Sequence, residues 1–514
     1  MIKNTLQLLD FRRLGFVAIF LSLLTLTPLI DPDYFWHLRT GQYLFEQGAL
    51  PASDIFSYTR SGTPWVLHEW LFELLLYGIY SLLGGFGISL LVSVLATATL
   101  VISCSTANKI LGKPYTAFFL TLTGFILLKA GIAPRPQLVT FLLLAVFLRV
   151  LTGFKYFGET RGLRVLPVLM AVWVNFHAGY AIGLALLLLF TACEWVIFLA
   201  SDDRPATQRR NLQWLSLVAA ATVLASLANP YFIGHWLYPF QVMDMEASRS
   251  YISEWRSPGF HNLRDRVYLA LVFAFFIATI YRKRKADLSE LAIPLCFFMM
   301  GFVAVRHITV AAITTLPFMA AALAQQPLTQ MMPARWRQGF FSWYSGRARK
   351  GQDMGDKEYL LNWLLLAFIL AGFLLYYPIQ QARNTEALEK TMPVAATEFI
   401  LREGIRGRMF NAYHYGGYLI YRLYPAQPVF IDGRADMYGD AFVREYMEIS
   451  GGLENWESLF NQYRIDYVLI PRGGPLQQLL VGRGDFKLVY EDKENVVLLR
   501  NNEKYAAIIA RHPH

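Results

Sequence analysis

Cysteine is scarce in this chain of 514 residues, which contains only three. Cys104, Cys193 and Cys296 all lie inside apolar runs, so no pair is available in any loop. The sequence therefore excludes a disulfide-stapled fold and a zinc site made of thiolates. Solenoid-type repeats and low-complexity linkers are also absent.

Charged residues are few as well, at 16% of the chain, against roughly a quarter in ordinary soluble domains. The chain is 55% hydrophobic, with a mean hydropathy of +0.35. Lys and Arg outnumber Asp and Glu by 47 to 37, a balance that could point to nucleic acid. The excess lies in short loops between apolar runs, which is the pattern of a membrane protein. We therefore expect a lipid bilayer, and no nucleic acid, as a partner.

Long apolar runs extend from the N-terminal region to residue 377, and a hydrocarbon core about 30 Å thick demands runs of about 20 residues. The first run has no small-residue cleavage site after it, so we expect a retained anchor. The segment 66–84 is apolar but opens with His68 and Glu69, so it either spans the bilayer or lies at its interface. The sequence predicts about eleven spans, at 14–30, 86–105, 115–131, 137–152, 165–176, 179–200, 212–228, 266–281, 289–305, 308–325 and 358–377.

The loops between these runs alternate in charge. Five loops on the N-terminal side are basic, with Lys109 and Lys113, Lys155 to Arg164, Arg204 to Arg210, Arg282 to Lys285, and Arg335 to Lys350. Because basic loops stay in the cytoplasm, we expect a cytoplasmic N-terminus in the cell (inner) membrane. The polar loops 31–69 and 229–266 and the chain after about residue 378 are then extracytoplasmic.

The last 130 or so residues have a different character, because polar residues return and short β-rich runs alternate with helical patterns. The predicted strands are at 428–431, 467–471, 486–490 and 496–499, and the predicted helices are at 393–403, 440–449 and 454–463. The last two strands read as a hairpin. We predict an all-α membrane domain at 1–377, followed by a small extracytoplasmic α/β domain at 378–514.

Nearly all the unusual polar residues fall on the predicted outer side. Asp31 and Asp33 lie directly at a membrane boundary and are followed by three aromatic residues, then His37 and Arg39. Ionisable groups near membrane level are functional candidates because their burial is costly. A capped helix start just outside the bilayer explains the two carboxylates equally well.

Cationic candidates lie in other outer loops. Arg135 occupies the tight turn 133–137, and Arg306 and His307 end a later span. Each could receive a phosphate or simply anchor the end of a span at the interface. His177 is either a catalytic candidate or a polar turn residue. Glu254, in the loop 229–266, is either a site residue or half of a surface ion pair with Arg256.

Two segments of the predicted outer domain carry candidates for binding an acceptor. His414 and Tyr415 lie in an aromatic, glycine-bearing run at 411–418. Asp432 and Arg434 follow the predicted strand 428–431, and strand ends in α/β folds are common binding positions. Turn chemistry explains Gly433, which lies between them, equally well.

Three of these segments give the chain a resemblance to the GT-C superfamily of membrane glycosyltransferases, which use sugars carried on polyprenyl phosphates. DYFWHLRT (33–40) is similar to the first-loop Asp-Pro-aromatic-Phe-Asn-Tyr-Arg motif of oligosaccharyltransferase catalytic subunits, which selects Asp33. It also resembles the Asp-Glu-x-x-Tyr start of the mannosyl- and aminoarabinose transferases, which selects Asp31. Glu254 with the preceding Ser resembles the end of a Ser-Val-Ser-Glu motif, and HYGGY (414–418) lies where oligosaccharyltransferases have Trp-Trp-Asp-Tyr-Gly.

The chain also departs from that pattern. The second outer loop of oligosaccharyltransferases carries acidic residues that help to hold a divalent cation, whereas 133–137 has none. If Mg²⁺ or Mn²⁺ takes part, the resemblance implies Asp33 and Glu254 as its ligands, but the departure favours a metal-free mechanism like that of the aminoarabinose transferases. His414 replaces the acceptor-reading Asp, which argues against an Asn-x-Ser/Thr peptide as acceptor.

The resemblance implies an inverting glycosyltransferase that moves a sugar or glycan from a polyprenyl-phosphate or -diphosphate donor to a lipid, protein or polysaccharide acceptor. Such transfer needs a carboxylate that takes the acceptor proton and cations that stabilise the departing phosphate. Asp31 or Asp33 would be the base, with Glu254 assisting. The expected substrate- and phosphate-binding residues are His37, Arg39, Arg135, His177, Arg306 and His307. Two alternatives remain open: a non-catalytic protein of the same fold that scaffolds cell-envelope glycan assembly, and a transporter, which would need polar sites near the midplane of the membrane.

Overall fold

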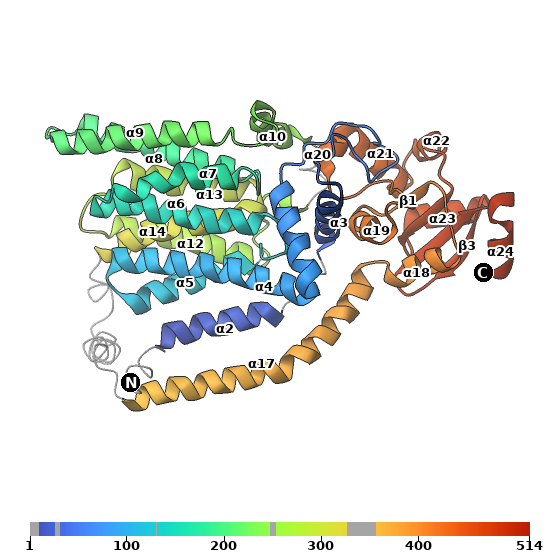
Figure 1. Cartoon of the computed structure of the whole chain (residues 1–514), viewed down its shortest axis with the longest axis horizontal. Helices are drawn as coiled ribbons and strands as arrows, with labels where there is room; N and C mark the ends of the chain where they lie inside the picture. Colours follow the sequence, from blue (N-terminus) through green and yellow to red (C-terminus); the bar gives the residue numbers. More distant parts are fainter. Residues whose placement is uncertain (1–9, 26–30, 130, 247–252, 326–355, 514) are drawn as a thin grey trace.

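The computed structural model describes residues 10–25, 31–129, 131–246, 253–325 and 356–513. A bundle of long helices forms one half of the molecule, and a smaller domain that holds the C-terminus forms the other (Figure 1). The long helix α17 (Asp356–Thr391) leads from the bundle to this domain. The predicted domain boundary at 377/378 falls inside α17, which continues through Pro378.

The bundle helices coincide with the apolar runs of the sequence. They are α2 (Phe11–Thr25), α4 (Trp70–Leu111), α5 (Pro114–Lys129), α6 (Gln137–Phe157), α7 (Val165–Trp173), α8 (Tyr180–Ala200), α9 (Ala206–Ala225), α12 (Leu263–Ile280), α13 (Leu288–Val303) and α14 (Ile308–Ala324). Short connecting elements are η2 (Arg161–Arg164), α10 (Ile233–Asp244), η3 (Ser253–Trp255) and η4 (Val305–His307).

Within the described residues, five helices are long and apolar enough to cross a bilayer by length and composition. They are Trp70–Leu111, Gln137–Phe157, Tyr180–Ala200, Val305–Ala324 and Leu360–Thr391. The helices α5 and α13 are apolar but shorter. The expected count of about eleven spans is therefore not confirmed. The nine residues of α7, for example, extend only about 14 Å at 1.5 Å per residue.

Two helices run across the end of the bundle that faces the C-terminal domain (Figure 1). The segment 31–69, which the sequence presents as a polar loop, begins with helix α3 (Pro32–Gln47). Asp31 caps α3, since its side chain accepts a hydrogen bond from the backbone N–H of Asp33. The second crossing helix is the first part of α4, which ends at a kink where Gly84 has a φ of 58°. Segment 66–84 thus lies across the bundle end, as an interfacial segment would.

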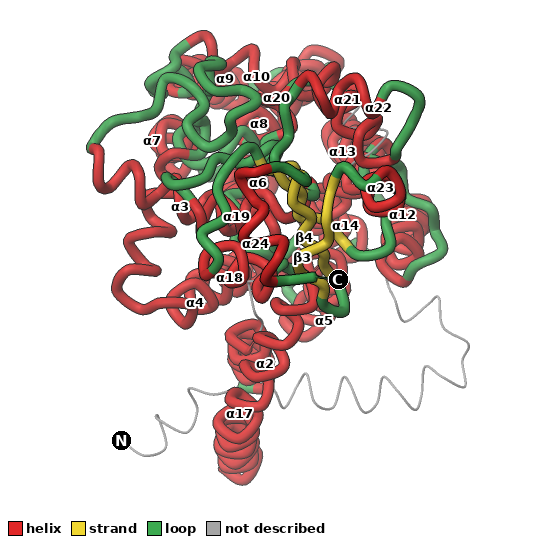
Figure 2. Tube along the Cα trace, turned by 90° about the vertical axis from the view of Figure 1, so that its right-hand side faces the viewer, coloured by secondary structure: helices red, strands yellow, loops and turns green. Residues whose placement is uncertain are grey.

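Helices α2 and α17 lie to one side of the bundle in both views (Figures 1 and 2). Only 6% of the apolar window of α17 is buried inside the protein. Side chains such as Phe368, Leu374 and Leu375 are therefore exposed on its surface. An apolar helix with so little protein contact is suited to contact with lipid.

The C-terminal domain is a four-stranded sheet with helices on both faces. Its strands are β1 (Met409–Asn411), β2 (Tyr467–Pro471), β3 (Phe486–Glu491) and β4 (Asn495–Arg500), in the order β1-β2-β4-β3. β1 is parallel to β2, and the other two pairs are antiparallel. The helices are α18 (Val394–Arg402), α19 (Gly416–Leu423), α20 (Ala435–Tyr438), α21 (Asp440–Gly451), α22 (Trp456–Gln462), α23 (Pro475–Arg483) and α24 (Ala506–Arg511), with the short turns η5 (Tyr413–Tyr415) and η6 (Glu503–Tyr505).

Side chains along β2 alternate between two hydrophobic cores, as the period of a strand requires. Tyr467 and Leu469 pack with α18 and α19 on one face, and Val468 and Ile470 pack with α21, α22 and α23 on the other. The strand at 467–471, the hairpin and the helices α18, α21 and α22 were predicted from the sequence. The strand predicted at 428–431 is wrong, because this segment makes only an isolated bridge, from Val429 to Ser57.

The segment 428–431 pairs with the chain that follows α3. Val429 N–H donates to the carbonyl of Phe56, and Tyr58 N–H donates back to the carbonyl of Val429, at 3.0 and 3.1 Å. Phe56 and Trp65 are buried in the same core as α18 and α19. The segment before α4 is therefore built into the C-terminal domain, and this fixes α3 between bundle and domain.

Candidate functional site

Carboxylates and arginines from four distant segments meet where α3 abuts the bundle. We call Asp31, Asp33, Arg135, Glu254 and Arg306 the carboxylate–arginine cluster. Arg135 Nε lies 2.9 and 2.8 Å from the two carboxylate oxygens of Asp31, and its Nη2 lies 3.0 Å from Asp33 Oδ2. Glu254 contacts Arg135 at 3.5 Å and Arg306 at 3.8 Å. The structure thus brings together the five charged residues on which the expected chemistry depends most.

Asp33 occupies the most unusual position in this cluster. Burial raises the pKa of its carboxyl to about 7, Arg135 opposes this, and the carboxylates of Asp31 and Glu254 raise it further. Trp36 donates a 3.3 Å hydrogen bond from Nε1 to Asp33 Oδ1. The side chain still keeps 22% of its surface exposed. A reachable carboxyl with a pKa near neutrality suits proton transfer.

The C-terminal domain touches Asp33 through a glycine. A Cβ atom on Gly433 would overlap Oδ1 of Asp33, so only glycine lets the backbone approach this closely. Tyr413, from the same domain, donates a 3.2 Å hydrogen bond to the carbonyl of Gly433. The turn that carries Gly433 therefore forms one wall of the site.

Replacing Gly433 with alanine is expected to displace the Asp33 carboxylate. If the chain carries out the sugar transfer expected from its sequence, the rate should fall roughly 10²-fold, because misplacement by about 1 Å has that effect on positioned catalytic groups. Gly482→Ala is the matched control, since a Cβ there meets nothing within 4 Å. Initial rates of the two variants test this. Equal rates would show that the contact has no influence on the site.

Arg306 lies at the far side of the cluster. Its guanidinium stacks on Trp255, 4.3 Å from the ring centroid, and keeps 28% of its side-chain surface exposed. His307 lies edge-on to the same ring, with centroids 6.5 Å apart. Arg135, in contrast, is held by three carboxylates, which raise its pKa against the effect of burial. Arg306 is therefore the better placed of the two arginines to receive an anion.

The two carboxylates expected to hold a divalent cation, Asp33 and Glu254, do not fit that role. The guanidinium of Arg135 contacts both, at 3.0 and 3.5 Å. This cation stands where a metal ion would have to bridge the two carboxylates, and it would repel one. The cluster therefore offers three carboxyl groups and two arginines for chemistry.

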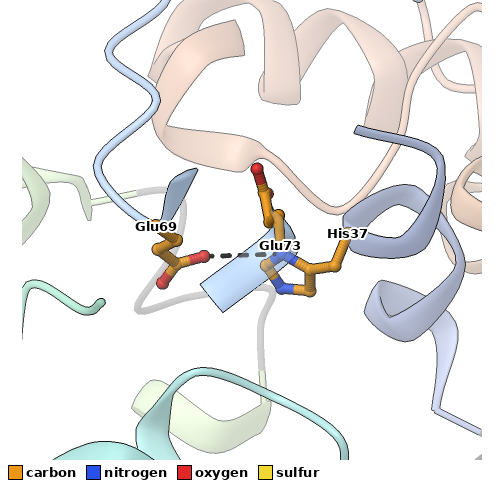
Figure 3. A group of neighbouring side chains, drawn as sticks. All are labelled: His37, Glu69 and Glu73. Atoms are coloured by element: carbon orange, nitrogen blue, oxygen red, sulfur yellow. Dashed lines mark hydrogen bonds and ion pairs between the residues drawn. The ribbon is translucent and has the colours of Figure 1, made fainter. Parts of the chain in front are cut away.

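A second polar cluster adjoins the first, and we call His37, Glu69 and Glu73 the acid–histidine cluster (Figure 3). His37 lies one helical turn after Asp33 on α3, and the two glutamates lie at the start of α4. His37 Nδ1 is 3.0 Å from Glu73 Oε1 and 3.6 Å from Glu69 Oε2. All three side chains are buried.

More histidines surround Glu69. His68 Nε2 and His177 Nε2 lie 3.1 and 3.6 Å from Glu69 Oε1. Burial lowers the pKa of His37 to about 3 and that of His177 to about 4, so both imidazoles are neutral at physiological pH. Thr140 lies 2.8 Å from Nδ1 of His177 and fixes its ring. His37 and His177 thus meet around Glu69, beside the carboxylate–arginine cluster.

Comparison with known proteins identifies the architecture. No protein-family model and no curated protein sequence matches this chain. Among solved structures, ArnT from Cupriavidus metallidurans bound to undecaprenyl phosphate matches with a TM-score of 0.50 and 15% identity, covering 94% of this chain and 97% of ArnT. The archaeal oligosaccharyltransferase AglB from Archaeoglobus fulgidus, in complex with an inhibitory peptide and a dolichol-phosphate, matches with a TM-score of 0.54 and 11% identity, covering 88% of this chain and 69% of AglB.

This chain has the GT-C fold. At 10–15% identity the likeness concerns the fold alone. It agrees with the helices long enough to cross a bilayer, so the chain is a multi-pass membrane protein of GT-C architecture with a small C-terminal sheet. The resemblance inferred from the sequence motifs is confirmed at this level.

Three predicted site residues lie away from the two clusters of this GT-C fold. Arg39 donates to the carbonyl of Tyr424 at 2.9 Å and stacks on its ring, so it fastens α3 to the C-terminal domain. His414 is exposed. Tyr415 is buried in the domain core and donates a 2.6 Å hydrogen bond to Asn495.

Asp432 and Arg434 are fully buried in an ion-pair network. Arg434 donates to both carboxylate oxygens of Asp432 at 2.7 Å, and its Nη2 lies 2.9 Å from Asp54, in the chain after α3. Tyr438 donates to Asp432 at 2.7 Å. These residues, which the sequence offered as an acceptor site, hold the turn with Gly433 in place. They are not exposed to an acceptor.

Residues that the sequence analysis missed complete the site. Glu73 lies in an apolar helix and was not singled out from the sequence. Its spacing of four residues from Glu69 places both side chains on one face of α4, and this was the signal that could have found it. Trp36, Gly433 and Asp54 act through contacts between segments far apart in the chain. No local pattern predicts such contacts.

Proposed function

We propose that this protein is a GT-C glycosyltransferase that transfers a sugar or glycan from a polyprenyl-phosphate-linked donor to an extracytoplasmic acceptor. The observation that carries the proposal is the carboxylate–arginine cluster, in which the Asp33 carboxyl, with a pKa near 7, is connected to Arg306 through Arg135 and Glu254. The structural neighbours support the donor class, because ArnT is bound to undecaprenyl phosphate and AglB to a dolichol-phosphate.

Asp33 is the proposed base. It accepts the proton of an acceptor hydroxyl while that oxygen attacks the anomeric carbon of the sugar. The bond from this carbon to the phosphate oxygen breaks, and the lipid phosphate leaves with the electron pair. A single displacement of this kind inverts the configuration of the sugar. Trp36 and Gly433 hold the Asp33 carboxylate in place.

Arg306 is the proposed receptor of the leaving phosphate, with His307 beside it. Glu254 keeps Arg306 and Arg135 on either side of its carboxylate. It would orient the acceptor or assist the base. Arg135 holds Asp31 and Asp33 together, and electrostatic stabilisation of the departing phosphate falls mainly to Arg306.

The donor class can be tested before the sugar is known. Undecaprenyl phosphate is the product that the proposed reaction would release, so the purified full-length protein in nanodiscs should bind it more tightly than it binds undecaprenol. We expect Arg306→Ala to weaken phosphate binding about tenfold, the typical effect of losing a charge-assisted hydrogen bond. Native mass spectrometry measures both. Equal binding of lipid phosphate and lipid alcohol would overturn the proposal.

The raised pKa of Asp33 predicts a pH dependence of transfer. Because a base must be ionised, and the folded pKa is about 7 where the ordinary value is 3.8, kcat/KM should fall about tenfold per pH unit below pH 7 and level off above it. An Asp with an ordinary pKa would keep its rate down to about pH 4. A rate constant that is flat from pH 5 to pH 8 would contradict the assignment of Asp33 as base.

A further inference from the structure

The acid–histidine cluster has the geometry of a metal site. Its three ligand atoms, one each from His37, Glu69 and Glu73, lie within 4.8 Å of one another. Around a tetrahedral ion with bonds of about 2.0–2.1 Å, ligand atoms are about 3.3 Å apart. The separations of His37 Nδ1 from Glu73 and from Glu69, 3.0 and 3.6 Å, bracket that value.

An unpaired oxygen points to a missing partner. Glu73 is fully buried, and its Oε2 has no hydrogen-bond partner among the described residues. A buried carboxylate oxygen without a partner costs free energy on the order of 1–3 kcal/mol or more. A cation bound by both oxygens of the Glu73 carboxylate would remove that cost.

The surroundings of Glu69 also fit metal coordination. Its Oε1 is contacted by His68 and His177, whereas its Oε2 faces His37. Carboxylates that bind a metal through one oxygen are commonly held by hydrogen bonds on the other. Oε2 of Glu69 therefore stays available to a metal ion beside His37.

Close packing of α3 on α4 builds the cluster. Gly41 lies one turn after His37, and a Cβ there would overlap the backbone carbonyl of Glu73. The missing side chain lets the two helices approach, which brings the His37 ring to the glutamates (Figure 3). The close approach of the two helix backbones therefore sets the positions of the three side chains.

We propose that His37, Glu69 and Glu73 bind a divalent transition-metal ion, for which Zn²⁺ is the probe. One imidazole and two carboxylates suit Zn²⁺, with the fourth position open. The ion clamps α3 to the start of α4 and so positions Asp33, one turn away on α3. This site is separate from the carboxylate–arginine cluster, and its existence does not depend on the proposed transfer reaction.

The experiment measures zinc bound to the purified full-length protein in detergent, loaded with Zn²⁺ and then desalted. We expect about one Zn²⁺ per chain by elemental analysis, and at least tenfold weaker binding in His37→Gln and in Glu73→Gln. Glu254→Gln is the discriminating control, because it removes the carboxylate that the sequence offered as a metal ligand. This variant should keep its zinc.

A second readout guards against variants that fail to fold. Zn²⁺ should raise the melting temperature of the wild-type protein, a chelator should reverse the shift, and X-ray absorption should show nitrogen and oxygen ligands without sulfur. Glu73→Gln should melt cooperatively with no zinc-dependent shift. The proposal is overturned if the wild-type protein holds no zinc, or if zinc is lost from Glu254→Gln and retained by Glu73→Gln.

Discussion

Asp33→Asn should reduce sugar transfer by a factor of about 10²–10⁴, the contribution of a well-placed general base. Asparagine keeps the shape of the side chain and the contact with Trp36, but it cannot accept the acceptor proton. Binding of undecaprenyl phosphate should stay within about threefold of the wild-type value, because the phosphate is assigned to Arg306. Single-turnover release of the lipid phosphate from a panel of polyprenyl-phosphate sugars measures the rate.

Two comparisons sharpen this result. Asp202→Asn changes an exposed carboxylate in the loop between α8 and α9, and it should transfer at the wild-type rate. Asp31→Asn should cost less than Asp33→Asn, since Asp31 holds Arg135 and caps α3. Replacing both Asp31 and Asp33 should abolish transfer while leaving the protein in the membrane. Full activity in Asp33→Asn would refute the assignment of the base.

Arg434→Met should destabilise the docking of the C-terminal domain by about 3–5 kcal/mol. Removing the guanidinium leaves Asp432 and Asp54 buried without their cation, and breaking one side of a buried ion pair has an effect of that size. The segment that carries Phe56 should then become sensitive to protease. Limited proteolysis and thermal unfolding in detergent measure the change.

The matched control for this prediction is Arg444→Met. Arg444 pairs with Glu246, but both side chains are more than half exposed, and such surface pairs contribute about 0–1 kcal/mol. Adding Asp54→Asn to Arg434→Met should recover part of the lost stability by removing one of the orphaned charges. An unchanged melting temperature in Arg434→Met would show that the network does not hold the domain.

Much of the architecture is predictable from the sequence because it depends on local pattern. Apolar runs of bilayer length set the bundle helices, and period-two alternation with polar connections sets the hairpin at 486–499. The count of spans is less accessible, since short helices such as α7 have the composition of a span but not its length. The run 428–431 has strand-like composition, but its partner is the distant segment near Ser57.

The site, like the fold, could be predicted from the sequence only in part. The sequence placed all five residues of the carboxylate–arginine cluster on one predicted face of the membrane. Because the end of the bundle is small, this was enough to expect that they lie close together. The burial of Arg434 could not be anticipated, since Asp54 lies far away in the sequence. The same holds for Glu73, whose neighbour His37 comes from another helix.

The hydrophobic core that segment 48–69 shares with the C-terminal domain has a consequence for biogenesis. Phe56 and Trp65 leave the ribosome early, whereas the helices that cover them, α18 and α19, are among the last quarter of the chain to be made. During that interval the two aromatic side chains lack their partners in the protein. We expect them to be buried at the bilayer interface, which aromatic side chains favour. The carboxylate–arginine cluster is then among the last features to mature, and a ribosome that stops before residue 433 produces a helix bundle without the glycine turn beside Asp33.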